Sequence, residues 1–83
     1  MTLEALKTAK RVIGIKQVAK AVKREAATEV FIADDADAKV VEPLETLCTE
    51  QNVPVSRVSS MKELGTACSI EVGAAAAAAV KQS

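Results

Sequence analysis

The chain has 83 residues, of which 49% are hydrophobic and 27% charged, and its formal net charge is zero. This length suits one domain, so we expect residues 1–83 to fold as a single unit. The sequence contains no His, Trp or Tyr, which excludes imidazole catalysis, His-ligated metal sites and platforms of stacked aromatic rings. Two cysteines are too few for a disulfide framework or a zinc site. With neither a signal peptide nor a membrane-spanning run in the sequence, we expect a reducing cytoplasm as the setting. Nothing in the sequence indicates more than a monomer, which we therefore expect.

The zero net charge conceals a strong segregation along the chain. Residues 1–24 carry seven Lys or Arg and one Glu, whereas residues 25–51 carry eight Asp or Glu and one Lys. Such segregation can place a basic patch on a neutral molecule. A plain solvated helix surface would explain the basic segment equally well.

The first third of the chain predicts a helix, a short strand and a second helix. Residues 3–10 divide into an apolar and a basic side, which is typical of a helix. Val12–Ile15 is a short apolar run interrupted by Gly14 and predicts a strand that ends in a turn. Residues 16–26 form the clearest amphipathic pattern, with a small apolar arc opposite a polar one. The polar arc consists of Lys16, Gln17, Lys20, Lys23 and Arg24.

The middle of the chain predicts a buried strand, an acidic turn and a helix. Val30–Ala33 is continuously apolar, as in a strand covered on both faces. The following helix is predicted to run to about residue 50, with its regular part beginning near Pro43, which lacks an N–H group. Its predicted buried residues are Val40, Val41, Leu44, Leu47 and Cys48.

The last third predicts a strand, a helix and a segment of ambiguous structure. Val53–Val58 is expected to be an edge strand, because Pro54 cannot donate a hydrogen bond. Ser60 and Glu63 form a capping-box pattern at the start of a helix. Its predicted buried residues are Met61, Leu64 and Cys68. Ala74–Ala79 favours a helix by propensity, but the preceding alternation of strands and helices favours a final strand.

This alternation predicts an α/β fold, a three-layer α/β/α sandwich around a four-stranded mixed sheet. Ligands of such sheets bind where a strand turns into a helix, because N–H groups at helix starts lack partners. Gly14 permits a positive φ at one such turn, and Lys16 and Lys20 lie one helical turn apart beyond it. Gln17, beside them, can address base edges. These residues predict anion or nucleic-acid binding, although a solvated helix start fits them too.

Two further groups of residues have a functional and a plain interpretation. Ile70–Gly73 places a carboxylate between exposed apolar residues and could hold an unstacked base, or it is an ordinary connecting loop. Asp34, Asp35 and Asp37 could bind a divalent cation, but their spacing lacks the calcium-loop pattern. The sequence favours Asp37 as a helix cap and the other two as solvated carboxylates. Both cysteines are expected in the core.

The order and spacing of several segments resemble the kink-turn RNA-binding proteins of the ribosomal L7Ae and L30e superfamily. The likeness is strongest to its small bacterial, YbxF-like branch and runs from about Lys7 to Val80. Its carriers are Gly14–Gln17 with Lys20, Ile32–Asp37, Leu47–Cys48, Asn52–Val55 and Leu64–Ala75.

The resemblance implies an α/β/α sandwich that binds kink-turns, which are sharp RNA bends built on tandem sheared G·A pairs. By this resemblance, four residues would face those pairs: Gly14, Lys16, Gln17 and Lys20. They would lie on a basic face that includes Lys23. The loop residues Ile70, Glu71 and Val72 would hold a flipped-out nucleotide, with Asp37 beside it. In this pattern Lys16 and Gln17 stand where archaeal and eukaryotic relatives have asparagine and glutamate.

Three positions depart from the family pattern. Val18-Ala19 stands where a threonine is usual, so a polar contact is expected to be missing. Glu25-Ala26 stands where a glycine is usual and is expected to lengthen or reshape the helix end. Ser69 replaces a frequent glycine, and we expect strain at Ser69 if its φ is positive.

We therefore predict an RNA-binding protein that is not an enzyme, needs no cofactor or metal, and stabilises kink-turns as a ribosomal or ribosome-associated protein. One alternative is a structural ribonucleoprotein component that acts mainly through protein contacts of the acidic segment 25–51. Another is an enzyme with a phosphorylated ligand at the Gly14 turn, which the lack of a base and nucleophile pair disfavours.

Overall fold

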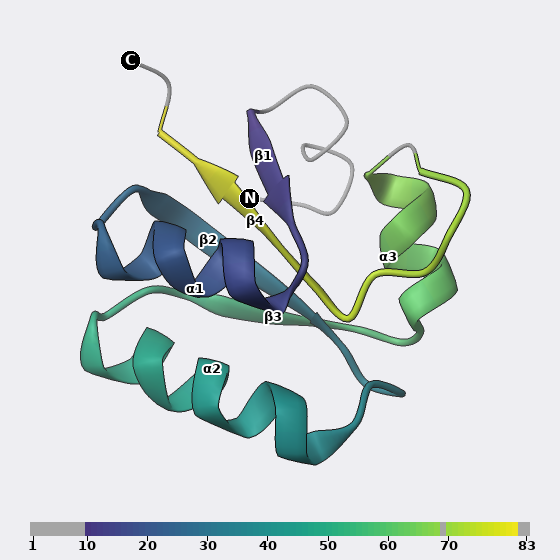
Figure 1. Cartoon of the computed structure of the whole chain (residues 1–83), viewed down its shortest axis with the longest axis horizontal. Helices are drawn as coiled ribbons and strands as arrows, with labels where there is room; N and C mark the ends of the chain where they lie inside the picture. The colour runs from purple at the N-terminus through teal and green to yellow at the C-terminus, as the bar shows by residue number, and fades with distance from the viewer. Residues whose placement is uncertain (1–9, 69, 82–83) are drawn as a thin grey trace.

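The computed structural model describes residues 10–68 and 70–81 as three helices packed on a four-stranded sheet (Figure 1). The elements in chain order are β1 (Arg11–Ile13), α1 (Ile15–Lys23), β2 (Ala27–Ala33), α2 (Ala38–Glu50), β3 (Val55–Val58), α3 (Met61–Ala67) and β4 (Ala76–Val80). The strand order is β1-β4-β2-β3, with β2 and β3 parallel and the other pairs antiparallel. The predicted α/β fold with a mixed sheet is confirmed. The helix predicted over residues 3–10 lies outside the described residues, except for Lys10, which is not helical.

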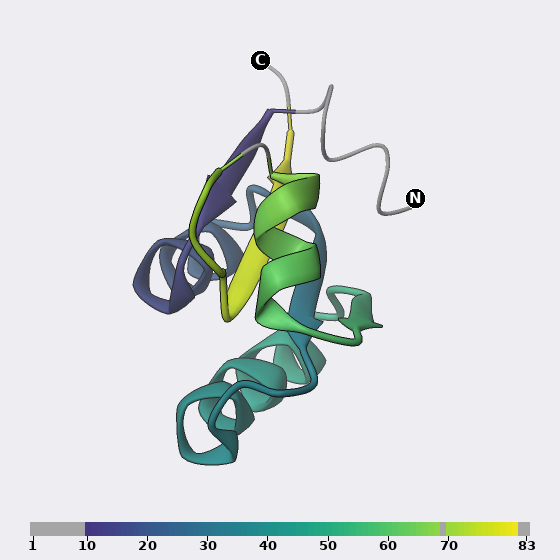
Figure 2. The ribbon, with the colours of Figure 1, turned by 90° about the vertical axis from the view of Figure 1, so that its right-hand side faces the viewer.

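The core consists of two layers of apolar side chains, one on each face of the sheet. Helices α1 and α2 cover one face, where Val18, Val22 and Leu44 pack against β2 and β4. Helix α3 covers the other face, where Leu64 packs with Phe31 and Cys68. Figure 2 shows helix α3, and separately helices α1 and α2, from the side. Within the described residues, no helix has the length and hydrophobicity to cross a lipid bilayer.

The alanine run forms the central strand β4, which confirms the prediction of a final strand. Ala76, Ala77, Ala78 and Ala79 have no exposed surface, and alternate members belong to the two core layers. A helix of these few residues would gain too little from propensity alone. As a strand, the same segment gains hydrogen bonds on both sides and burial on both faces. Its small side chains let helices approach closely from either face.

Several element boundaries differ from the predictions. The first strand ends at Ile13, and Ile15 opens α1, because Gly14 turns the chain between them. Strand β2 begins at Ala27, three residues before the predicted Val30 start. Strand β3 begins at Val55 and lies at a sheet edge, as Pro54 predicted.

Helix α2 begins at Ala38, so the prediction that its regular part begins near Pro43 is wrong. The Asp37 carboxylate accepts a hydrogen bond from the Lys39 N–H group and caps the helix start. Together with buried side chains further along, this cap outweighs the one N–H group that Pro43 lacks. Val40 was predicted to be buried but is 43% exposed, because it lines the open cavity between α1 and α2.

Helix α3 has the predicted cap, in which the Ser60 hydroxyl accepts from the Glu63 N–H group. Met61 was predicted to be buried but is 36% exposed, because it is the first residue of α3 and belongs to neither core layer. The predicted burial of Cys48 and Cys68 is confirmed. Burial raises the pKa of both thiols; Glu45 raises that of Cys48 further, and Arg11 partly opposes the rise at Cys68. Both therefore act as core side chains.

Candidate nucleic-acid interface

Three loops that were singled out in the sequence meet at one end of the strands of the sheet. Because β4 runs antiparallel to β1 and β2, its first residues lie beside the last residues of both. The Gly14 N–H group donates to the Ala76 carbonyl over 2.9 Å, and the Ala33 N–H group donates to the Ala75 carbonyl over 2.9 Å. The β1–α1 turn, the β2–α2 loop and the α3–β4 loop are thereby held together, and Figures 1 and 2 show them converging where β4 begins.

The β1–α1 turn leaves an open position in front of helix α1. Gly14 has a φ of 99°, which side chains rarely adopt, and a Cβ atom there would meet nothing within 4 Å. Glycine also provides no side chain to cap the helix, so the N–H groups of the first turn receive no side-chain acceptor. The turn thus combines free space with oriented N–H groups, the arrangement that binds anions at helix starts.

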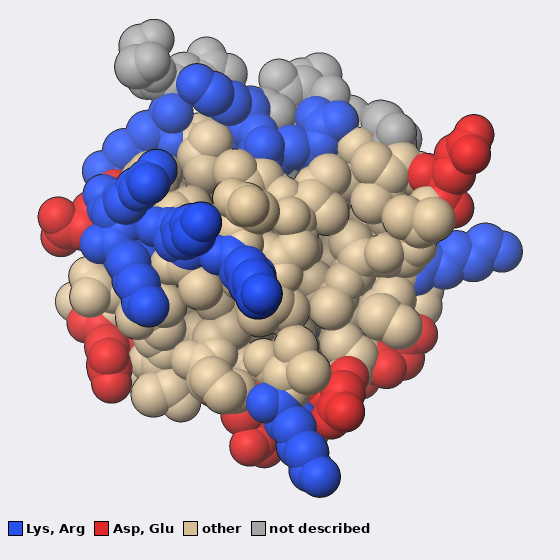
Figure 3. All heavy atoms as spheres, in the orientation of Figure 1, with Lys and Arg blue, Asp and Glu red and all other residues tan. Residues whose placement is uncertain are grey.

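Helix α1 presents a basic face beside this turn. Val18 and Val22 are fully buried, while Lys16, Gln17 and Lys20 are exposed. The predicted division of the helix into a buried apolar arc and an exposed polar arc is confirmed. In Figure 3 the Lys and Arg side chains gather over the side of the molecule that carries α1.

The polar arc is divided between two depressions. Gln17, Lys20 and Arg24 line one of them, next to the ends of β1 and β4. Lys23 lines the other, a cavity of about 460 Å³ between α1 and α2, where Glu50 is also present. Lys23 therefore lies at the border of the polar arc that faces α2, and Gln17 lies at the border that faces β1 and β4.

The α3–β4 loop is held in place by helix α3. The Ile70 N–H group donates to the Gly65 carbonyl over 3.0 Å, and the Ala74 N–H group donates to the Met61 carbonyl over 3.0 Å. Ile70 is half-buried against the core, whereas Glu71 and Val72 project outward and Val72 is 71% exposed. An exposed valine on an anchored backbone is an apolar surface available to a ligand.

Gly65 and Arg11 position this loop, and neither was among the residues predicted for the site. A Cβ atom on Gly65 would lie 2.2 Å from the Val72 carbonyl oxygen, so the loop approaches α3 more closely than any side chain allows. The Arg11 guanidinium donates to the Cys68 carbonyl over 2.7 Å from β1. A glycine inside a helix was the sequence signal for a close approach. Ser69, and any strain there, lies outside the described residues.

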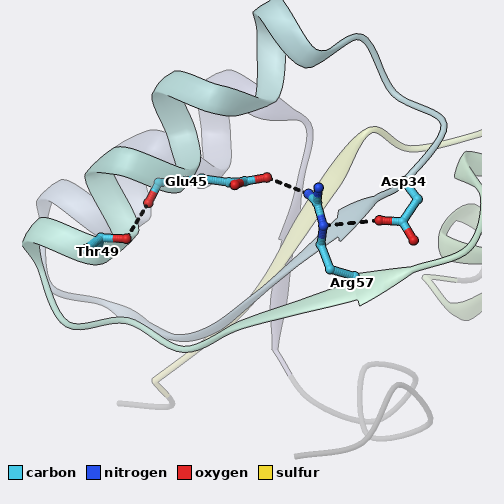
Figure 4. A network of polar contacts seen from close by, with 4 residues as sticks. All are labelled: Asp34, Glu45, Thr49 and Arg57. Carbon is cyan, nitrogen blue, oxygen red and sulfur yellow. Dashed lines mark hydrogen bonds and ion pairs between the residues drawn. The ribbon is translucent and has the colours of Figure 1, made fainter.

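The three aspartates after β2 have separate structural partners. Asp34 forms an ion pair with Arg57 over 3.1 Å, and Figure 4 shows Arg57 between Asp34 and Glu45. The Asp35 carboxylate accepts from the Met61 N–H group over 2.7 Å, at the start of α3. The prediction that Asp37 caps a helix is confirmed, but Asp34 and Asp35 are not merely solvated. Among the described residues, no group of three His, Cys, Asp or Glu is placed to hold a metal ion.

At the Glu25 departure the backbone adopts a positive φ just after the end of helix α1. Helix α1 ends at Lys23, and the chain reverses through Glu25 with a φ of 58°. The Ala26 N–H group donates to the Ala21 carbonyl over 2.9 Å, which completes the usual hydrogen bonding of a helix end. The helix predicted to run to residue 26 therefore ends at Lys23, and a glutamate occupies a conformation that favours glycine. Val18 is buried in the core, so it offers no polar contact.

The chain is similar to known proteins in sequence and in fold. The family described as ribosomal protein L7Ae/L30e/S12e/Gadd45 matches residues 2–83. The RNA-binding protein YbxF of Geobacillus stearothermophilus is 49% identical over 78 residues, which are 94% of this chain and 95% of that protein. An RNA-binding protein of Halalkalibacterium halodurans is 47% identical over 70 residues, covering 84% of this chain and 85% of that one.

The fold is also shared with solved structures. A 15.5 kD RNA-binding protein of Giardia lamblia superposes with a TM-score of 0.88 at 31% identity, over 96% of this chain and 71% of that chain. The family match spans nearly the whole sequence, and the bacterial relatives cover most of both chains. The chain therefore belongs to the ribosomal protein L7Ae/L30e/S12e/Gadd45 family.

Proposed function

We propose that this protein binds RNA, and that its specific target is a kink-turn whose bent form it stabilises. The observation that carries the proposal is the hydrogen bond between the Gly14 N–H group and the Ala76 carbonyl. It fixes the basic β1–α1 turn next to the loop that presents Glu71 and Val72. The printed names of the bacterial relatives and of the Giardia protein, all RNA-binding proteins, support the same class of ligand.

The residues of the turn suit the charge and shape of a bent RNA. Lys16 and Lys20 attract phosphates, and binding releases the counterions that screen them. The first-turn N–H groups beyond Gly14 can donate to a phosphate at short range. Gln17 can donate to and accept from base edges, which sheared G·A pairs expose more openly than a regular RNA helix does.

The α3–β4 loop supplies the second half of the interface. Ile70 and Val72 offer apolar surface to an unstacked base, and Glu71 can accept hydrogen bonds from base amino groups. Asp37 lies at the end of the neighbouring β2–α2 loop, where its carboxylate already caps α2. We assign it a peripheral contact. Binding both sides of the bend would favour the bent RNA over the extended one and shift an existing equilibrium.

The test compares a kink-turn RNA with a copy in which the G·A pairs are replaced by Watson–Crick pairs. We expect tight binding to the intact motif and at least about tenfold weaker binding to the copy at moderate salt, as each lost base contact costs about 1–3 kcal/mol. Gln17→Ala should reduce this difference, while Lys39→Gln, on α2, should preserve it. Equal affinity of the wild-type protein for both RNAs would refute specific recognition.

The contacts of the acidic segment favour RNA binding over a role based mainly on protein contacts. Glu29 is buried and accepts a hydrogen bond from the Ser56 hydroxyl. Asp34 and Glu45 bind Arg57, and Asp35 binds the start of α3. These carboxylates stabilise the fold itself, which leaves few of them for a partner protein. Association with the ribosome is part of the proposal and would follow from a kink-turn in ribosomal RNA.

A further inference from the structure

A basic depression extends from the polar arc of α1 to the start of β1 and the end of β4, which is the end of these strands opposite the Gly14 turn. It measures about 300 Å³. The Val80 N–H group donates to the Lys10 carbonyl over 2.9 Å, and the Lys81 N–H group donates to the Ala26 carbonyl over 2.8 Å. These bonds join the start, the first third and the end of the described chain. We call this surface the Lys10–Lys81 depression.

The lining of the depression is cationic. Its charged members are Lys10, Lys20, Arg24 and Lys81, and no carboxylate lines it. All four side chains are exposed. None of them forms an ion pair with another residue in the described part of the chain. Figure 3 shows Lys and Arg atoms continuing from α1 toward the end of β4. Four like charges with no internal partner repel one another, and a polyanion would relieve that repulsion.

The depression is continuous with the proposed interface, because Gln17 and Lys20 line it as well. If an RNA places a base edge at Gln17, the adjoining part of its backbone would pass over Lys10 and Lys81. Along that backbone the repeating anionic group is the phosphodiester. Apart from Gln17, the uncharged wall residues are small or aliphatic, such as Val12 and Ala21, and have no polar group that could read a base edge.

We propose that the Lys10–Lys81 depression binds the phosphodiester backbone of one stem that flanks the kink-turn. This inference rests on the proposed function and extends it from the bend to its neighbouring helix. Backbone contacts supply affinity and salt dependence but carry no sequence information. The depression therefore adds affinity without changing which motif is recognised.

The test neutralises the two residues that lie outside helix α1, in the variant Lys10→Gln/Lys81→Gln. We expect its affinity for the kink-turn at low salt to fall about tenfold, and the slope of log affinity against log salt to shrink by about 1.8 for two lost phosphate contacts on a double-stranded stem. Discrimination against the disrupted RNA should stay as in the wild type. The control Lys39→Gln/Lys62→Gln removes the same charge from α2 and α3 and should keep the wild-type slope.

A second series shortens each RNA stem in turn. Shortening the stem that lies over the depression should abolish the difference between wild type and Lys10→Gln/Lys81→Gln, while shortening the other stem should preserve it. An unchanged salt slope in the double variant, or a difference that neither shortened stem removes, would overturn the inference. Both results leave wild-type discrimination intact, whereas loss of that discrimination would refute the proposed function itself.

Discussion

Replacing Gly65 by alanine tests whether the α3–β4 loop depends on its close approach to helix α3. The new Cβ atom would stand 2.2 Å from the Val72 carbonyl oxygen, and contacts below 3.0 Å essentially never occur. The carbonyl group must therefore retreat, because the helix backbone on the other side is fixed by the core around Leu64. The hydrogen bond from Ile70 to the Gly65 carbonyl lies in the path of this movement.

The magnitude follows from opposing effects. Alanine inside a helix is favoured over glycine by about 1 kcal/mol. Overpacking costs about 1–3 kcal/mol, and the weakened loop hydrogen bonds add about 1 kcal/mol. We expect a net destabilisation of about 1–3 kcal/mol, or a fall in Tm of roughly 4–24 °C for a domain of this size. Because Val72 moves with its carbonyl group, affinity for the kink-turn should also fall about tenfold or more.

The assays are urea unfolding and RNA binding, performed on Gly65→Ala and on the neighbouring exposed variant Thr66→Ala. The Thr66 hydroxyl donates only to the Lys62 carbonyl within the same helix, so Thr66→Ala should leave RNA affinity unchanged and stability equal or slightly higher. Unchanged stability together with unchanged affinity in Gly65→Ala would refute the reasoning, since both follow from the same displaced carbonyl group.

Three further predictions concern stability. Glu25→Gly should raise the free energy of unfolding, measured in urea, by about 0.5–1 kcal/mol, because glycine adopts a positive φ without strain. Asn52→Gly, at a similar φ, should raise the free energy of unfolding by less, since asparagine tolerates this conformation. Equal effects of the two substitutions would contradict the explanation by backbone strain. Asp35→Ala should cost about 1 kcal/mol by removing the acceptor of the Met61 N–H group, whereas no loss would show that bond to be dispensable. Burial raises the pKa of the Cys48 thiol, so the unfolded chain releases this proton first as pH rises and stability should fall above the ordinary thiol pKa; Cys48→Ala should show a shallower fall between about pH 8 and about pH 10.

The fold was predictable because local patterns and the global arrangement agree. Apolar runs alternate with amphipathic segments, and the caps at Asp37 and Ser60 are chemically specific. The alanine run was ambiguous locally, since its propensity favours a helix. Only its position as the central strand, covered on both faces, decides the matter. The start of α2 was placed too late because the effect of one missing N–H group was weighed more heavily than a good cap.

The candidate site was predictable only where one segment contains all its parts. The turn at Gly14 and the polar arc of α1 follow from local periodicity. In contrast, the clamping of the loop by Gly65, the reach of Arg11 and the neighbourhood of Lys10 and Lys81 depend on contacts between distant segments. A helical periodicity also cannot say that Lys23 borders the groove toward α2, because that border is set by the packing of two helices.

Strand β4 links the stability of the core to the geometry of the interface. Its first residues are bound by the Gly14 turn on one side and by the end of β2 on the other. Ala76 is at once fully buried in the core and the acceptor for the Gly14 N–H group. A larger side chain at that position would push the strand away from α1 and would displace the β1–α1 turn and the α3–β4 loop with it. The alanines therefore do more than fill a thin core: they set how closely the two halves of the proposed RNA-binding surface lie together.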